Sequence, residues 1–340
     1  MEIEKKLLKK DKLAIIIEKI VAEGTKVFAP VKKGNQINFD TISSISEMTE
    51  DYIVTVKSSK LVAFPKIEKL FDYKISKEGD TVENVNFDSI PNQVLLGARP
   101  CDADGFASLN AIFTWDYKDN IFIKRLEKTT IIGISCLKSD SNCFCTSVGG
   151  NPGSTKGSDI LLTLVNDNDY LAEIITEKGK AFVSKFPDLF EESQPVEKEK
   201  FLADVPQKFN LKEVNQNLSQ IFESDLWVEQ SLRCLGCGAC AYVCPTCACF
   251  DIQDETNTKT GTRLRLWDSC GLSLFTQHTS GHNPREVQSQ RWRQRIMHKF
   301  SYMPDRLNVY GCVGCGRCSR ACPVDMNIVE HLTNIEEVKK

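Results

Sequence analysis

Two short runs of cysteines constrain this chain more than any other feature of its sequence. The first is "CLGCGACAYVCP" at residues 234–245, and the second is "CVGCGRCSRACP" at residues 312–323. Both follow the spacing C-x-x-C-x-x-C-x-x-x-C-P, and 67 residues separate Cys244 from Cys312. The 340 residues contain 15 cysteines in all, so the fold must give a use to an unusual number of thiols.

The N-terminus does not have the features of a secretion signal. Its apolar run covers only residues 13–17, acidic residues interrupt the surrounding sequence, and no small-residue cleavage site follows. No stretch reaches the roughly 18 apolar residues that span a bilayer. We therefore expect a cytoplasmic protein without a membrane partner. Thiols stay reduced in that compartment, so ligation of a metal or cluster explains the cysteines better than disulfides do.

The spacing of the two runs is that of bacterial two-cluster ferredoxins, in which the fourth cysteine of each run ligates the other cluster. Two-residue gaps let three cysteines wrap one cube, while the fourth lies too far along the chain to close it. The sequence therefore predicts two [4Fe-4S] clusters. The first would be held by Cys234, Cys237, Cys240 and Cys322, and the second by Cys312, Cys315, Cys318 and Cys244.

Zinc is the alternative ligand for such cysteines. Structural zinc sites use separated cysteine pairs around a tetrahedral ion, and not three equally spaced cysteines followed by C-P. The repeat of the whole pattern favours the clusters. Glycines within both runs also allow backbone amides to approach the sulfurs closely.

The remaining sequence predicts an α+β protein. Residues 1–190 are expected to form a mixed α/β domain, residues 191–228 a linker and helix, and residues 229–340 a ferredoxin-like domain with an insertion at 250–311. Apolar residues at helical spacing predict a first helix that stops at Gly24. "KVFAPV" and "DYIVTV" are expected strands, and "DILLTLV" with "YLAEIIT" an expected hairpin. Asp102 is the expected N-cap of a helix that carries Phe106 and Phe113.

Several phrases outside the cysteine runs are specific. "LLGARPCDADG", "IIGISC" and "NCFCTSVGG" lie upstream, and "CPTCACF", "WDSC" and "GHNPR" lie at or between the runs. Together they resemble the β subunit of cytosolic sulfhydrogenase-type [NiFe] hydrogenases and its sister, the A subunit of anaerobic sulfite reductase. The resemblance implies an electron-transfer subunit that connects a flavin- and NAD(P)-binding subunit with a hydrogenase or sulfite reductase catalytic subunit.

A different class of function is a flavin- or nucleotide-dependent oxidoreductase in its own right. The chain lacks G-x-G-x-x-G after a strand, and "GGNPGSTKGSD" lacks the G-K-[ST] ending of a phosphate loop. A flavin is therefore the less favoured cofactor. Nucleic-acid binding would depend on one basic helix, and the net charge of −3 gives it no support.

That basic helix is "REVQSQRWRQRIMHK". Arg291, Arg295 and Lys299 share one of its faces, and Trp292 begins an apolar face. The basic face is either solvated or offsets the charge of the clusters. His278, His282 and His298 nearby are candidate ligands, although histidines are more often simply hydrogen-bonded.

Seven cysteines remain outside the ferredoxin pattern. Four are in the first domain, where two follow predicted buried strands and two lie in one polar loop, and they are enough for a third [4Fe-4S] cluster. These four are Cys101, Cys136, Cys143 and Cys145. The other three lie in or beside the insertion and would need a fourth ligand such as Asp268, a histidine or a borrowed cysteine. These three are Cys247, Cys249 and Cys270.

Overall fold

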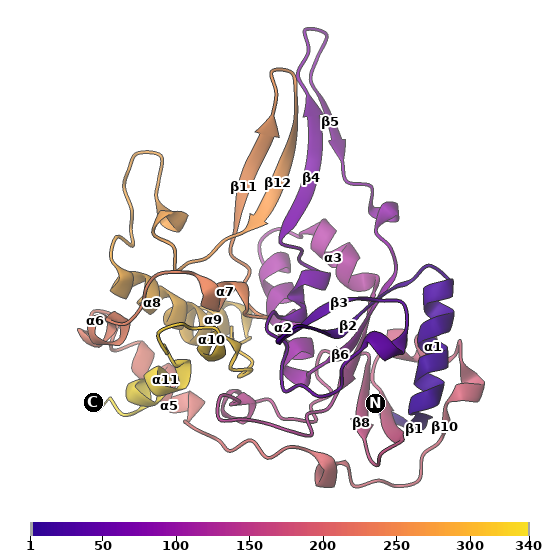
Figure 1. The fold of residues 1–340 in the computed structure, drawn as a ribbon. Helices are drawn as coiled ribbons and strands as arrows, with labels where there is room; N and C mark the ends of the chain where they lie inside the picture. Colours follow the sequence, from indigo (N-terminus) through magenta and orange to yellow (C-terminus); the bar gives the residue numbers. More distant parts are fainter. Residues whose placement is uncertain (1–2, 339–340) are drawn as a thin grey trace.

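The computed structural model describes residues 3–338. Its largest element is an eight-stranded sheet with the order β10-β1-β9-β8-β7-β6-β2-β3, seen on the right of Figure 1. The four inner strands β8, β7, β6 and β2 run parallel, and the outer strands pair antiparallel to their neighbours. The strands are β1 (Glu4–Lys9), β2 (Lys26–Lys33), β3 (Gln36–Ile42), β6 (Gln93–Ala98), β7 (Thr129–Ile134), β8 (Ile160–Leu164), β9 (Asp169–Ile174) and β10 (Glu191–Glu192).

Helices cover both faces of this sheet, which is why its inner strands are continuous apolar runs. Every residue of β6 is buried. Val94 and Leu96 pack on the side of α1 (Lys10–Ala22) and α4 (Glu177–Val183). Leu95, between them, packs on the opposite side with α2 (Pro100–Thr114) and α3 (Asn120–Glu127). The alternation of side chains along a strand thus feeds two cores.

A second sheet of four strands has the order β11-β12-β4-β5 and protrudes from the body of the molecule in Figure 1. Its strands are β4 (Ile67–Lys74), β5 (Thr81–Asn84), β11 (Phe250–Thr256) and β12 (Thr260–Trp267). β4 and β5 come from the N-terminal half, and β11 and β12 from the insertion. Arg265 on β12 lies opposite Glu68 on β4, and both are buried, with Nε of the arginine 3.1 Å from Oε2 of the carboxylate.

The C-terminal half is helical around its own apolar core. Its helices are α5 (Leu211–Leu218), α6 (Leu226–Ser231), α7 (Ala239–Tyr242), α8 (Gln288–Met297), α9 (Met303–Leu307), α10 (Arg317–Arg320) and α11 (Ile328–Glu336). A π-helical turn, η8 (His298–Tyr302), continues α8 into α9. The 3-10 turns are η1 (Ile45–Glu47), η2 (Ser59–Val62), η3 (Phe87–Ser89), η4 (Cys145–Val148), η5 (Pro187–Leu189), η6 (Lys198–Phe201) and η7 (Ser273–Thr276).

The structure confirms the α+β class, the first helix with Gly24 beyond its end, the strand at "KVFAPV" and the hairpin β8–β9. The strand expected at residues 51–56 is wrong, because this segment is irregular. Its side chains are used for anchoring instead: Tyr52 is buried and donates to the carbonyl of Gly97.

The expected N-cap role of Asp102 is also wrong. Arg99 occupies the N-cap position of α2, and Pro100 begins the helix, where its missing N–H costs nothing. Asp102 therefore lies inside the first turn, and its carboxylate is free to bind elsewhere. No helix within residues 3–338 is both long enough and apolar enough to cross a membrane.

Candidate metal centres

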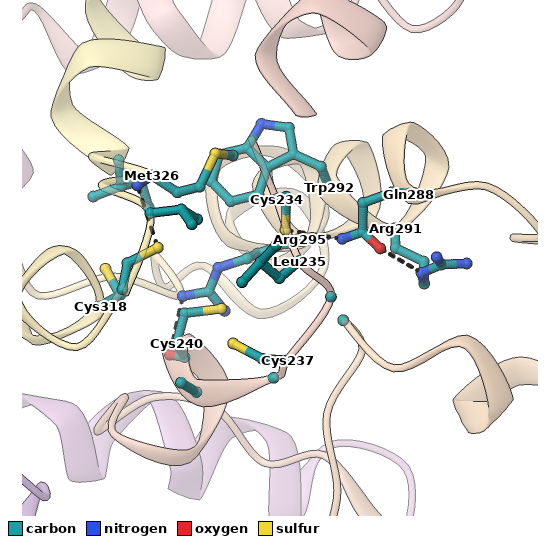
Figure 2. Close-up of a pocket in the computed structure, with 17 residues that line it drawn as sticks. Cys234, Leu235, Cys237, Cys240, Gln288, Arg291, Trp292, Arg295, Cys318 and Met326 are labelled. Atoms are coloured by element: carbon teal, nitrogen blue, oxygen red, sulfur yellow. Dashed lines mark hydrogen bonds between the residues drawn. The ribbon is translucent and has the colours of Figure 1, made fainter. Parts of the chain in front are cut away.

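Four cysteines of the ferredoxin pattern surround one pocket at the N-terminus of α7 (Figure 2). Gly238, the N-cap of α7, has φ +74°, and a Cβ there would meet Ser269 at 3.0 Å. Two N–H groups already point at sulfur: Gln288 Nε2 lies 3.1 Å from Cys234 Sγ, and the amide of Met326 lies 3.3 Å from Cys322 Sγ. Such donors stabilise thiolate charge. The four are Cys234, Cys237, Cys240 and Cys322.

The second predicted set lies deeper. Burial raises the pKa of Cys312 to about 12 and that of Cys315 to about 11, and it also raises the pKa of Cys318. Negative charge on Cys244 raises each of these pKa values further. Because such electrostatic effects weaken with distance, the four sulfurs lie near one another. Cys318 also lines the pocket of the first set, so the two sets are neighbours.

Lys299 ties these two sets together. Its Nζ lies 3.4 Å from Cys244 Sγ, 3.1 Å from Thr246 Oγ1 and 2.5 Å from the carbonyl of Gly311. Thr246 donates to the same carbonyl at 2.6 Å. The buried contacts therefore fasten the segment that carries Cys244 to the start of the second cysteine run.

The four cysteines of the N-terminal half also gather. Cys136 follows β7, and its amide donates to the carbonyl of Pro152 at 2.8 Å. Burial raises its pKa to about 11, and charge on Cys143 raises it further. Burial raises the pKa of Cys145 to about 12, with further increases from Cys136 and Cys143. Charge on Cys136 also raises the pKa of Cys101, which burial alone holds well above its usual value.

The N-terminal group touches the second cysteine run through the backbone. The amide of Phe144 donates to the carbonyl of Gly314 at 2.9 Å. A Cβ on Gly314 would lie 2.5 Å from Cys145 Cα, and one on Gly316 would lie 2.3 Å from the carbonyl oxygen of Asn142. Only glycine permits so close an approach, so the two cysteine-bearing loops lie against each other.

A buried ion pair reinforces this junction. Arg317, in the second run, is 2% exposed, and Asp102, in the first turn of α2, is 1% exposed. Arg317 Nη2 lies 2.8 Å from Asp102 Oδ2, and Arg317 Nε donates to the carbonyl of Thr55 at 2.8 Å. Sequence reasoning missed both roles, since only the tertiary contact distinguishes this aspartate from a helix cap.

The insertion cysteines line another pocket, together with Arg295, His298 and Lys299. A hydrogen bond from Cys270 lowers the pKa of Cys249. His278 and His282 instead contact each other in an exposed loop, with ring centroids 5.3 Å apart. These three cysteines are Cys247, Cys249 and Cys270.

The basic face of α8 is not solvated as one interpretation had it. Arg295 and Lys299 are buried, and Arg295 Nη1 lies 3.6 Å from Cys247 Sγ. Trp292 and Phe300 lie in the helical core, as the periodicity predicts. The alternative interpretation, that the cations face the cysteines, therefore describes Arg295 and Lys299.

The donor set suits iron–sulfur clusters. All 15 cysteines have free thiols, and those of the two ferredoxin runs lie in glycine-containing loops with N–H donors and buried cations around them. Within residues 3–338, no three histidine, cysteine, aspartate or glutamate side chains form a group that could hold a single metal ion.

Comparison with known families agrees with this chemistry. Residues 233–326 match the model of the 4Fe-4S dicluster domain. The fold and the paired cysteine runs thus define an iron–sulfur protein of the electron-transfer type. Over 323 residues the chain is 30% identical to the sulfhydrogenase 2 subunit beta of Pyrococcus furiosus, covering 93% of this chain and 92% of that protein. The chain belongs to this family of sulfhydrogenase beta subunits, as its sequence phrases predicted. No solved structure matches it.

Proposed function

We propose that this chain relays single electrons between a flavin- and NAD(P)-binding subunit and the catalytic subunit of a hydrogenase complex. Its relative is named as one subunit of a sulfhydrogenase, which supports a role within a larger assembly. The observation that carries the proposal is the backbone contact between the loop of Cys143 and Cys145 and the second cysteine run at Gly314. That contact puts three groups of thiols in series.

In this proposal the first cluster uses Cys234, Cys237, Cys240 and Cys322. The second uses Cys312, Cys315, Cys318 and Cys244. A third, in the proposed domain at residues 1–190, uses Cys101, Cys136, Cys143 and Cys145. When bound, such clusters accept and release one electron at low potential.

The chain's own residues give the series its order. Cys318 borders the pocket of the first set, so the second set stands between the first set and the N-terminal group. Burial of Cys244 and Cys315 excludes water from the middle of the series. Gln288 and Met326 donate N–H groups to sulfur at its other end. A series with neighbours on both sides suits conduction better than substrate chemistry.

The crossed ligation can be tested on the full chain, purified without oxygen and reduced stepwise in an EPR titration. Three variants are compared: Cys244→Ala, Cys315→Ala and Cys237→Ala. We expect the Cys244→Ala spectrum to match that of Cys315→Ala, since both lose the second cluster. A match with Cys237→Ala would contradict the assignment.

The relay role makes a separate prediction for the isolated chain. It should pass electrons from reduced methyl viologen to an artificial acceptor and should not evolve or oxidise hydrogen. Hydrogen turnover by the isolated chain would overturn the relay proposal, whatever the cluster ligands are.

A further inference from the structure

Three buried cations surround the insertion cysteines. Lys60 is 3% exposed, and Arg295 and Lys299 are 4% exposed. Within residues 3–338, none of the three has a carboxylate oxygen within 4.0 Å. A buried cation without a partner costs several kcal/mol. The protein must therefore supply negative charge at this place by another route.

The contacts of the cations show where that charge lies. Lys60 comes from η2 in the N-terminal half, and its Nζ lies 2.9 Å from the carbonyl of Cys247 and 3.2 Å from that of Ala241. Arg295, from α8, lies 3.6 Å from Cys247 Sγ. Lys299 lies 3.4 Å from Cys244 Sγ. Cations from three separate elements thus converge on one short segment of cysteines.

The ferredoxin clusters do not account for all three cations. Arg295 and Lys299 also face Cys240, Cys244, Cys312 or Cys318. The thiols that act on Lys60, in contrast, are first Cys247, then Cys244 and Cys249. Lys60 also lies 4.0 Å from the ring centroid of Trp267, three residues before Cys270. Its position points to charge on the insertion cysteines themselves.

The fold brings these cysteines together from both ends of a hairpin. β11 and β12 pair Phe250 with Trp267, and the amide of Asp268 donates to the carbonyl of Cys249 at 2.9 Å. Cys249 and Cys270 therefore meet at the base of the hairpin, and both line one pocket with Cys247. The other side chains bordering it include the imidazole of His298 and, among the described residues, no carboxylate.

We propose that Cys247, Cys249 and Cys270 bind a further [4Fe-4S] cluster, with His298 as its fourth ligand and Lys60, Arg295 and Lys299 balancing its charge. Asp268, the other nearby candidate, does not border the pocket, and Cys244 lies with the second ferredoxin set. Imidazole ligation raises the potential of an iron–sulfur cluster, and buried cations stabilise its reduced, more negative form. This cluster is therefore the most easily reduced one of the chain.

The ligands are tested by counting iron and sulfide in the full chain, purified without oxygen. Cys270→Ser should lose about four irons per chain, while the EPR signals of the two ferredoxin clusters persist. Ser273→Ala, an exposed neighbour, is the matched control and should lose none. His298→Ala should lose about one iron and give the EPR signal of an oxidised three-iron cluster. Unchanged iron in Cys270→Ser would overturn the site, and an unchanged spectrum in His298→Ala would overturn the fourth ligand.

The role of the cations is tested without touching a ligand. Lys60→Met removes the charge and keeps most of the side-chain volume. In a reductive EPR titration it should shift the midpoint of the highest-potential signal to a more negative value and leave the others in place. Lys66→Met, at an exposed lysine, is the control. Equal titrations of the two variants would overturn the charge-balancing role. Because the relay proposal is tested by hydrogen turnover and by the ferredoxin signals, the two proposals can fail separately.

Discussion

At the scale of single residues, the junction of the two cysteine-bearing loops depends on a missing side chain. Gly314 has φ +65°, and its hypothetical Cβ would lie 2.5 Å from both Cα and N of Cys145. Those are backbone atoms, which cannot rotate away as a flexible side chain could. Gly149 has a similar φ of +83°, but a Cβ there would meet nothing within 4 Å. The pair separates backbone strain from steric exclusion.

We predict that Gly314→Ala destabilises the protein more than Gly149→Ala does. Both variants carry the cost of a left-handed residue, about 1–2 kcal/mol, and only the first adds overpacking of about 1–3 kcal/mol. Anaerobic denaturant unfolding of the full chain measures the difference. Gly314→Ala should also lower the iron content, because the loops must separate. Equal unfolding midpoints would show that the close approach is not needed.

The buried pair of Arg317 and Asp102 acts at the same scale. Removing one partner of such a pair leaves an unpaired buried charge, whereas the intact pair is close to neutral for stability. Its value to this molecule is therefore specificity of docking: α2 and the second cysteine run meet in one register. Arg317 also contacts Thr55, so the irregular segment at residues 51–56 is held by the same side chain.

At the scale of elements, α8 and α11 pack through a histidine. His331 on α11 is 2% exposed, and its ring centroid lies 4.8 Å from that of Trp292 on α8. Neither ring nitrogen has a hydrogen-bond partner within the described residues. Burial lowers the pKa of His331 to about 4, so the helix pair holds the imidazole in its neutral form.

This lowered pKa predicts a pH-dependent stability. The unfolded chain protonates His331 near pH 6.5, and the folded chain resists protonation until about pH 4. Stability is thus complete above pH 6.5 and falls by up to about 3 kcal/mol as the pH drops to 4. His331→Phe removes this contribution, so the difference in unfolding free energy between variant and parent should change across that interval. His278→Gln, in an exposed loop, should show no such change, and parallel pH curves for His331→Phe and the parent would contradict the prediction.

At the scale of the whole molecule, the second sheet joins the two halves. β4 pairs with β12 over seven residue pairs from Thr260↔Lys74 to Leu266↔Ile67, and the buried contact between Arg265 and Glu68 lies within that pairing. Together with the contact at Gly314, this places two separate junctions across the proposed boundary between residues 1–190 and 229–340. The linker at residues 191–200 is only one of the connections.

We predict that the halves stay associated after the linker is cut. A specific protease site inserted between Gln194 and Pro195, both exposed, opens the chain outside every paired strand. The two fragments should elute together in gel filtration and retain their iron, because strand pairing and the buried ion pairs do not depend on chain continuity. Uncut protein carrying the same insertion is the control. Separate elution of the fragments would mean that the linker, and not the shared sheet, holds the halves.

The sequence by itself determined the features that neighbouring residues encode. The repeated cysteine spacing gave the chemistry, and continuous apolar runs such as "QVLLGA" gave buried parallel strands, because spacing and periodicity are local properties of the chain. The turn residues between β8 and β9 gave the hairpin in the same way. The family resemblance likewise followed from short contiguous phrases.

Only the tertiary structure decided which distant residues meet. Asp102 looks like a helix cap until Arg317, 215 residues away, binds its carboxylate. Lys60 looks like a surface lysine until the fold places it on Cys247, 187 residues away. The basic stripe of α8 has the pattern of a solvated face, and burial beside thiols gives it another role. In each case the decisive energy is that of burying charge, which depends on the neighbours that the fold supplies and not on the residues adjacent in the chain.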